Sequence, residues 1–400
     1  MRTATRVMAV CVILLVGRQA YAGDAIQIVA TPTGGGAPIE SSGSRLLPQL
    51  KDLTQSRGAF SGLAGQPFNA TVRYGEVHSA LQLSENASHT TATLSSRLSG
   101  LKQQFTATAA PALQSQVTDF VQTSTPIARY NAAIDHNSVF GVIDGNPRSA
   151  TAFLAEDAYF RWGQDPSTEG TSELGKNVNL RFDTSGGGMD ARGFSGYYYT
   201  AALGVDWQFT QPVGIALSIP FEYRNLAGTN TYIAGANLGI PINIIQMKHD
   251  GFGWRLTPFG STWGAFSDNL VAGGFFVTGG AVSSLRYRIG SFQATLMNEA
   301  TYNGGVPLTI GSINYETRVE QWLFKNGVQL AYAISDPLQV DASLTYSNYA
   351  HAAAIPDWWT VQMGLNWRFT DRSGVRVAYQ GDFGSGYTTN GGTVSLYLRF

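Results

Sequence analysis

The residues Gly391-Gly-Thr-Val-Ser-Leu-Tyr-Leu-Arg-Phe400 alternate between apolar and polar side chains and stop on an aromatic ring. The apolar set is Val394, Leu396, Leu398 and Phe400, and the intervening set is Thr393, Ser395, Tyr397 and Arg399. A period of two puts these sets on opposite faces of one β-strand. The sequence offers no later segment to bury the apolar face.

An amphipathic last strand with a terminal aromatic residue resembles the closing strand of a bacterial outer-membrane β-barrel. The resemblance implies that Phe400, Leu398, Leu396 and Val394 form an assembly signal recognised by the barrel assembly machinery. It also implies that outer-membrane lipid is a partner of the folded chain. The rest of the sequence must then alternate in the same way.

The period of two continues upstream of the last strand. Trp358–Phe369 is the clearest case, with an apolar set of Trp359, Val361, Met363, Leu365, Trp367 and Phe369. Similar sets recur back to Val178, which gives about twelve strands of roughly 9–15 residues, a length typical of tilted membrane strands. A soluble sandwich, the alternative, needs a second sheet over each apolar face. We therefore predict an all-β fold, a transmembrane antiparallel up-and-down β-barrel over residues 177–400.

The connections between the predicted strands give the barrel a direction. Tight turns are expected at 210–212, 290–291, 336–337 and 370–373, on the side of Phe400. Connections on the other side, such as 264–274, 303–320 and 350–357, are mostly longer. Outer-membrane barrels have short periplasmic turns and longer outer loops, so we place Phe400 at the periplasmic end.

The first 22 residues predict export. Arg2 and Arg6 precede the apolar run Val7–Val16, and Ala20-Tyr21-Ala22 follows as a cleavage site. This pattern is a secretory signal peptide, too short in its apolar part to span a bilayer. We expect a cleaved Sec signal and the outer membrane of a Gram-negative bacterium as the destination. The one cysteine, Cys11, lies inside this segment, so the mature chain has no thiol.

Composition agrees with a barrel. Charged residues make up 13% of the chain, against about 25% in a soluble domain. Mean hydropathy is −0.06, because lipid-facing and water-facing residues average out. The net charge is −1 and basic runs are absent, so nucleic acid is not expected as a partner.

The region before the barrel has a different character. Residues 23–146 form an N-terminal periplasmic, plug or short passenger region, and residues 147–176 a linker or plug segment. Residues 23–76 are rich in Gly, Ser, Thr and Pro and predict a flexible segment. Residues 77–130 predict a helix, because Leu94, Leu98, Leu101 and Phe105 recur at helical spacing, with a break or kink at Pro111.

Charged residues on the polar faces of the strands are expected to line the lumen. An arginine facing lipid near the midplane costs about 2–4 kcal/mol, which favours the inward direction. The candidates are Arg181, Asp206, Glu222, Arg224, Arg286, Arg288, Glu299, Asp341, Arg368, Arg376, Asp382 and Arg399. They either brace the wall as ion pairs or form a polar conduit.

Motifs for chemistry are sparse. The five histidines do not pair at metal-ligand spacing, so no metal and no cofactor is expected. His351 and Asp357 in one outer loop and Asp268 in another allow a catalytic rim, but solvated loops explain them better, and we expect no enzyme.

Three functional classes remain. The first is a channel for transport or secretion of small or unfolded cargo, gated by the N-terminal region. The second resembles an autotransporter-type translocator with a short passenger. The third is an adhesin or structural barrel, with Trp263, Trp358 and Tyr387 at loop tips that bind a partner.

Overall fold

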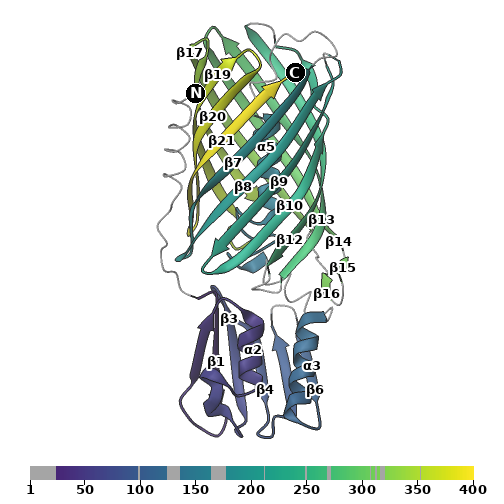
Figure 1. Cartoon of the computed structure of the whole chain (residues 1–400), viewed down its shortest axis with the longest axis vertical. Helices are drawn as coiled ribbons and strands as arrows, with labels where there is room; N and C mark the ends of the chain where they lie inside the picture. The colour runs from purple at the N-terminus through teal and green to yellow at the C-terminus, as the bar shows by residue number, and fades with distance from the viewer. Residues whose placement is uncertain are drawn as a thin grey trace.

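The structure, a computed structural model, describes residues 24–97, 100–123, 136–163, 177–210, 212–247, 250–267, 272–306, 308–310, 313–315, 320–351 and 353–400. They form a β-barrel, a small α/β domain at one end of it, and a helix inside the barrel (Figure 1). The predicted signal peptide lies outside the described residues.

The described barrel is a ring of 12 antiparallel strands, which confirms the predicted fold. The last strand pairs with the first, Arg399 opposite Asn179. Pairing of β10 with β12 completes the ring, and the short β11 continues β10 after a break at Ile240 and Pro241. Proline has no N–H for the ladder, which explains an interruption there. The strands are β7 (Asn177–Ala191), β8 (Phe194–Gln208), β9 (Gly214–Leu226), β10 (Thr229–Gly239), β11 (Ile242–Ile245), β12 (Gly251–Ser267), β13 (Ala272–Ile289), β14 (Phe292–Val306), β17 (Glu320–Ser335), β18 (Leu338–Tyr349), β19 (Asp357–Thr370), β20 (Ser373–Gly384) and β21 (Tyr387–Arg399).

The outside of the barrel is apolar. Met363 is 60% exposed and Phe400 is 62% exposed, and large apolar side chains are exposed on every strand of the ring from β7 to β21. No second sheet covers them within the described residues. Such a continuous apolar exterior is stable only in lipid, which identifies the ring as a membrane-spanning barrel.

The connections are only partly as predicted. Tight turns join β13 to β14, β17 to β18 and β19 to β20 at the Phe400 end. At the other end, however, three connections are two-residue turns, at 192–193, 227–228 and 385–386. Positive φ angles at Arg192, Ala227 and Gly386 close these turns. Only the connections after β12, β14 and β18 are longer, and β15 (Leu308–Ile310) and β16 (Ile313–Tyr315) form a small hairpin in one of them.

The N-terminal region is a folded α/β domain, so the prediction of a flexible segment over 23–76 is wrong. Its six-stranded sheet has the order β2-β1-β3-β4-β5-β6. Ile26, Ile28 and Ala30 on β1 alternate into its core. Such short alternating runs are difficult to recognise in the sequence, because many small residues surround them. The elements are β1 (Ile26–Pro32), β2 (Ile39–Gly43), α2 (Leu46–Thr54), the 3-10 helix η1 (Gly58–Leu63), β3 (Phe68–Tyr74), β4 (Val77–Glu85), β5 (Thr91–Ser96), β6 (Leu101–Thr106) and α3 (Ala110–Thr123).

The helix predicted over 77–130 is also wrong for most of its length. Within the described part of this range, β4, β5 and β6 lie between residues 77 and 106 and only α3 is helical, while Leu98 lies outside the described residues. Leu94 lies on β5 and Leu101 and Phe105 on β6, all three buried in the same core. A hairpin therefore produced the spacing that mimicked a helical stripe. Pro111 stands in the first turn of α3, where a missing N–H costs nothing.

Candidate functional site

The helix α5 (Ala150–Gly163) lies inside the barrel (Figure 1). It contacts strands from β10 to β17, and nearly all of its side chains are buried. A helix buried all round has no water-facing side. We call α5 the plug helix, and residues 136–149, which precede it, the neck.

The N-terminal domain sits at the barrel end opposite Phe400 (Figure 1). Glu76 holds it there, because its carboxylate accepts a hydrogen bond from the Val139 N–H at 2.8 Å and pairs with Arg192 at 3.3 Å. Phe140 of the neck packs edge-on against Tyr74 of the domain and Phe194 of the barrel, with centroids 5.9 Å and 4.9 Å away. One hydrophobic cluster runs from the domain core through the neck into the barrel mouth. The domain is therefore packed onto the barrel at this mouth.

Arg148 fastens the start of the plug helix to the wall. Its guanidinium lies 3.3 Å from the Asp382 carboxylate, 3.5 Å from that of Glu222 and 3.6 Å from that of Glu156. It also stacks 4.0 Å over the Tyr198 ring. Arg148 is 1% exposed, so a planar guanidinium with several donors suits this site better than lysine.

Arg224 of the wall holds the neck in return. Its guanidinium donates to the carbonyls of Gly141 and Arg148 at 2.8 Å and 2.9 Å and to the Asn146 side chain at 3.0 Å. Arg224 thus supplies hydrogen bonds to two carbonyls of the buried neck.

Polar pairs also surround the far half of the plug helix. Arg161 and Arg181 share the Asp183 carboxylate, at 3.1 Å and 2.7 Å. Asp157 accepts a hydrogen bond from Asn237 at 2.7 Å, and Glu156 accepts one from Gln380 at 2.6 Å. The charges of the plug helix and of the wall are therefore complementary on several strands.

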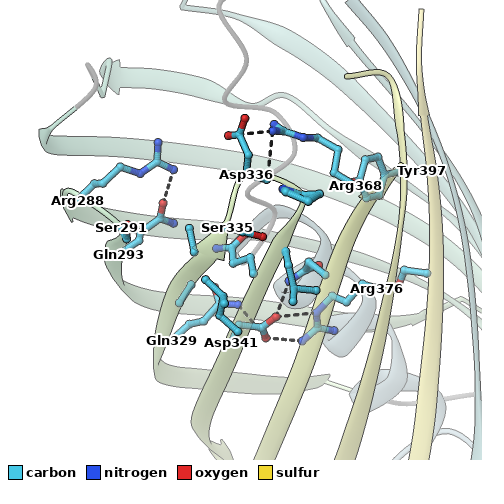
Figure 2. A pocket seen from close by; sticks show the side chains of 18 of the residues that line it. Arg288, Ser291, Gln293, Gln329, Ser335, Asp336, Asp341, Arg368, Arg376 and Tyr397 are labelled. Carbon is cyan, nitrogen blue, oxygen red and sulfur yellow. Dashed lines mark hydrogen bonds and ion pairs between the residues drawn. The ribbon is translucent and has the colours of Figure 1, made fainter. Parts of the chain in front are cut away.

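Beyond Gly163 the lumen widens into a cavity of about 720 Å³ near the Phe400 end, which we call the vestibule (Figure 2). Its lining includes Arg181, Arg288, Arg368, Arg376 and Arg399. Arg376 binds Asp341 at 2.6 Å, and Arg368 lies 3.3 Å from Asp336 at the rim. The lining also includes Asp250, Asp336, Asp341 and Asp371, so the vestibule is polar and carries charges of both signs.

The residues expected in the lumen all lie on the strand face opposite the exposed apolar set. Glu222, Arg224, Arg286, Glu299 and Asp382 are buried at the level of the plug, and Asp206 is half-buried. The remaining six line the vestibule: Arg181, Arg288, Asp341, Arg368, Arg376 and Arg399.

Sequence reasoning missed the partners of these residues. Arg148, Glu156 and Arg161 lie before the barrel, in a segment with no predicted face. Lys325 is buried on β17, with its ammonium 5.4 Å from the Trp358 ring. The apolar set of β17, Trp322 to Ile334 at even numbers, would have placed Lys325 inward had its period been extended.

The aromatic residues predicted at loop tips are not exposed. Trp263, Trp358 and Tyr387 are 0%, 1% and 2% exposed. Trp263 packs against Phe153 of the plug helix, with centroids 6.2 Å apart. Their positions on the inward faces of β12, β19 and β21 explain the error: they pack inside the barrel.

No contact among the described residues supports a catalytic site at the outer rim. The His351 backbone N–H donates to the Gln321 side chain, and the Asp357 carboxylate accepts from the Tyr346 hydroxyl. Asp268 lies outside the described residues. Among the residues described, no group of three His, Cys, Asp or Glu could hold a metal. None of the described helices is both long and apolar enough to cross a membrane.

Solved structures that this chain is similar to are outer-membrane barrels. One is the translocator domain of autotransporter NalP from Neisseria meningitidis, 12% identical, with TM-score 0.44, covering 65% of this chain and 99% of that one. Another is the transport unit of autotransporter AIDA-I from Escherichia coli, 11% identical, TM-score 0.44, covering 63% and 98%. The porin NanC is 12% identical, TM-score 0.38, covering 55% and 100%. No family model matches the chain. No curated protein matches it.

Proposed function

We propose that this chain is a display barrel, which anchors its own N-terminal domain at the cell surface and closes its pore with the plug helix. The observation that carries the proposal is the path of the chain. The domain sits at one mouth, α5 lies in the lumen, and β7 begins at the other mouth beside Phe400. A chain that left the periplasm through its own barrel would have this path.

Direction follows from the connections. The longest ones, after β14 and β18, lie at the end where the domain sits, whereas two-residue turns occur at both ends. Outer-membrane barrels carry their long loops outside. The domain is then on the cell surface, and the outward-facing Val394, Leu396, Leu398 and Phe400 act as the assembly signal at the periplasmic end. This proposal takes the second of the three predicted classes, with residues 24–123 as a short passenger.

Single-cysteine labelling of whole cells tests the direction, because the mature chain has no native cysteine. Lys102 is exposed on β6 of the domain, and Asp371 is exposed in a turn at the Phe400 end. We expect a membrane-impermeant maleimide to label Lys102→Cys in intact cells and Asp371→Cys only after permeabilisation. The reverse pattern would show a periplasmic domain and refute display.

A gated channel is the second candidate, and the vestibule favours it. A charged, polar cavity of about 720 Å³ at one end of the lumen suits solute entry if the plug helix moves. Voltage-dependent opening of the full chain in planar bilayers would support this function. A full chain that stays closed at all voltages would leave display as the better account.

A further inference from the structure

The last turn of the plug helix meets the wall at glycines. Three inward-facing glycines on different strands, Gly204 on β8, Gly239 on β10 and Gly327 on β17, each receive one large side chain. A β-carbon at Gly239 would lie 2.8 Å from the Trp162 indole, and one at Gly327 would lie 2.5 Å from the Tyr159 hydroxyl. One at Gly204 would overlap the Arg161 guanidinium. We call these positions the sockets.

The sockets lie on both sides of the lumen. In the ring, β8 and β10 are separated only by β9, whereas β17 is several strands away in either direction. Tyr159, Arg161 and Trp162 therefore brace one helical turn across the barrel. On a further side, Gly163 of the helix itself approaches Met297 of β14, to which an added β-carbon would come within 3.2 Å.

An apolar cluster lies at the same level of the lumen. Ala158 and Trp162 of the plug helix pack with Ala216, Phe259 and Val282 of the wall in one buried cluster. The Trp162 and Phe259 ring centroids are 5.2 Å apart. Ion pairs hold Arg161 beside it, with Asp183 at 3.1 Å and Asp157 at 3.6 Å.

We propose that Gly204, Gly239 and Gly327 are positioning residues that fix the depth and rotation of the plug helix, and so set where the outgoing chain stops. A shift by one residue moves a helix about 1.5 Å along its axis and turns it by about 100°. Tyr159, Arg161 and Trp162 would then leave their sockets together and collide with larger wall side chains. Only one register satisfies all three sockets. The inference rests on the proposed function in one respect, the direction in which the chain passes through the barrel. The fit of the helix to the sockets is independent of that direction.

Gly239 is the best socket to test, because its three nearest atoms all belong to Trp162. Gly327 also approaches the Leu344 carbonyl, so its substitution would disturb the sheet. The matched control is Gly279→Ala on β13, where an added methyl meets nothing within 4 Å and faces lipid.

The experiment measures the open fraction of the full chain in planar bilayers. We expect Gly239→Ala to raise the open fraction roughly tenfold or more, because overpacking by one methyl shifts packed equilibria by about one to two orders of magnitude. Adding Trp162→Phe, which shortens the ring in the socket, should restore closure, and Gly279→Ala should behave as the wild type. A closed Gly239→Ala, or a double variant more open than Gly239→Ala, would overturn the proposal.

A second variant covers the case in which Gly239→Ala does not fold, as judged by heat-modifiable gel migration. Trp162→Ala leaves the wall untouched and empties the socket, and we expect a rise of similar size. If Trp162→Ala stays closed, the sockets do not set the position of the helix. These bilayer readouts do not depend on the orientation of the barrel. If cysteine labelling refutes display but Trp162→Phe restores closure of Gly239→Ala, only the outward direction is discarded and the role of the sockets stands.

Discussion

At the scale of the residue, Arg148 is the centre of the closed state. Removing one partner of a buried charge cluster leaves the others unpaired, which costs about 3–5 kcal/mol. Glu222 and Asp382 are both 0% exposed, so water cannot replace the guanidinium without movement of the neck. The cluster therefore ties closure of the lumen to a single side chain.

We expect Arg148→Met to release the neck and raise the open fraction in bilayers about a hundredfold or more, as the loss of a buried ion cluster implies. Arg368→Met is the matched control, because Arg368 pairs with an Asp336 side chain that is 99% exposed. Exposed pairs are worth about 0–1 kcal/mol, so the control should remain closed. Equal effects of the two substitutions would mean that Arg148 does not hold the plug.

Individual residues also show which parts of the site could be predicted from the sequence. The period of two placed Glu222 and Arg224 on the polar face of β9, because lipid on the outer face enforces strict alternation. No such rule governs a helix packed inside a barrel, where every side is buried. Arg161 lies on this helix and could not be predicted for that reason, and Arg148 lies in the neck before it, where neither a strand nor a helix period applies.

At the scale of the element, the barrel strands were predictable and the N-terminal domain was not. Long strands against lipid carry a strong repeated signal, whereas β5 and β6 are six residues each and read as one helical stripe. Leu94 and Leu101 share a core through a hairpin, which a one-dimensional pattern cannot distinguish from a helix face. The pairing of β5 with β6 in the folded domain, and not the local spacing of apolar residues, determines that these segments are strands.

The strand β5 predicts that substitutions at two adjacent residues have different effects on the stability of the domain. Leu94 is 0% exposed, so Leu94→Ala should destabilise the domain by about 2–5 kcal/mol. Thr93 faces the other side of the sheet, and Thr93→Ala should have little effect. Hydrogen exchange over residues 24–123 measures both. Equal protection in the two variants would argue against this strand.

At the scale of the whole molecule, we propose that the domain, the neck and the plug helix close the barrel from one end. The domain covers the mouth opposite Phe400, Arg148 and Arg224 clamp the neck, and the sockets hold the last turn of α5. The vestibule remains as the polar space at the Phe400 end. Closure by the chain's own helix, rather than by loops of the barrel, is the central feature of the proposed function.

Single-channel recording of the full chain beside a barrel of residues 177–400 tests that feature most directly, with heat-modifiable migration confirming that both are folded. The full chain should hold a closed baseline, and the barrel alone should show stable conductance steps, because nothing else in the described residues fills its centre. A conducting full chain, or a shortened barrel that is equally silent, would contradict closure by the plug helix.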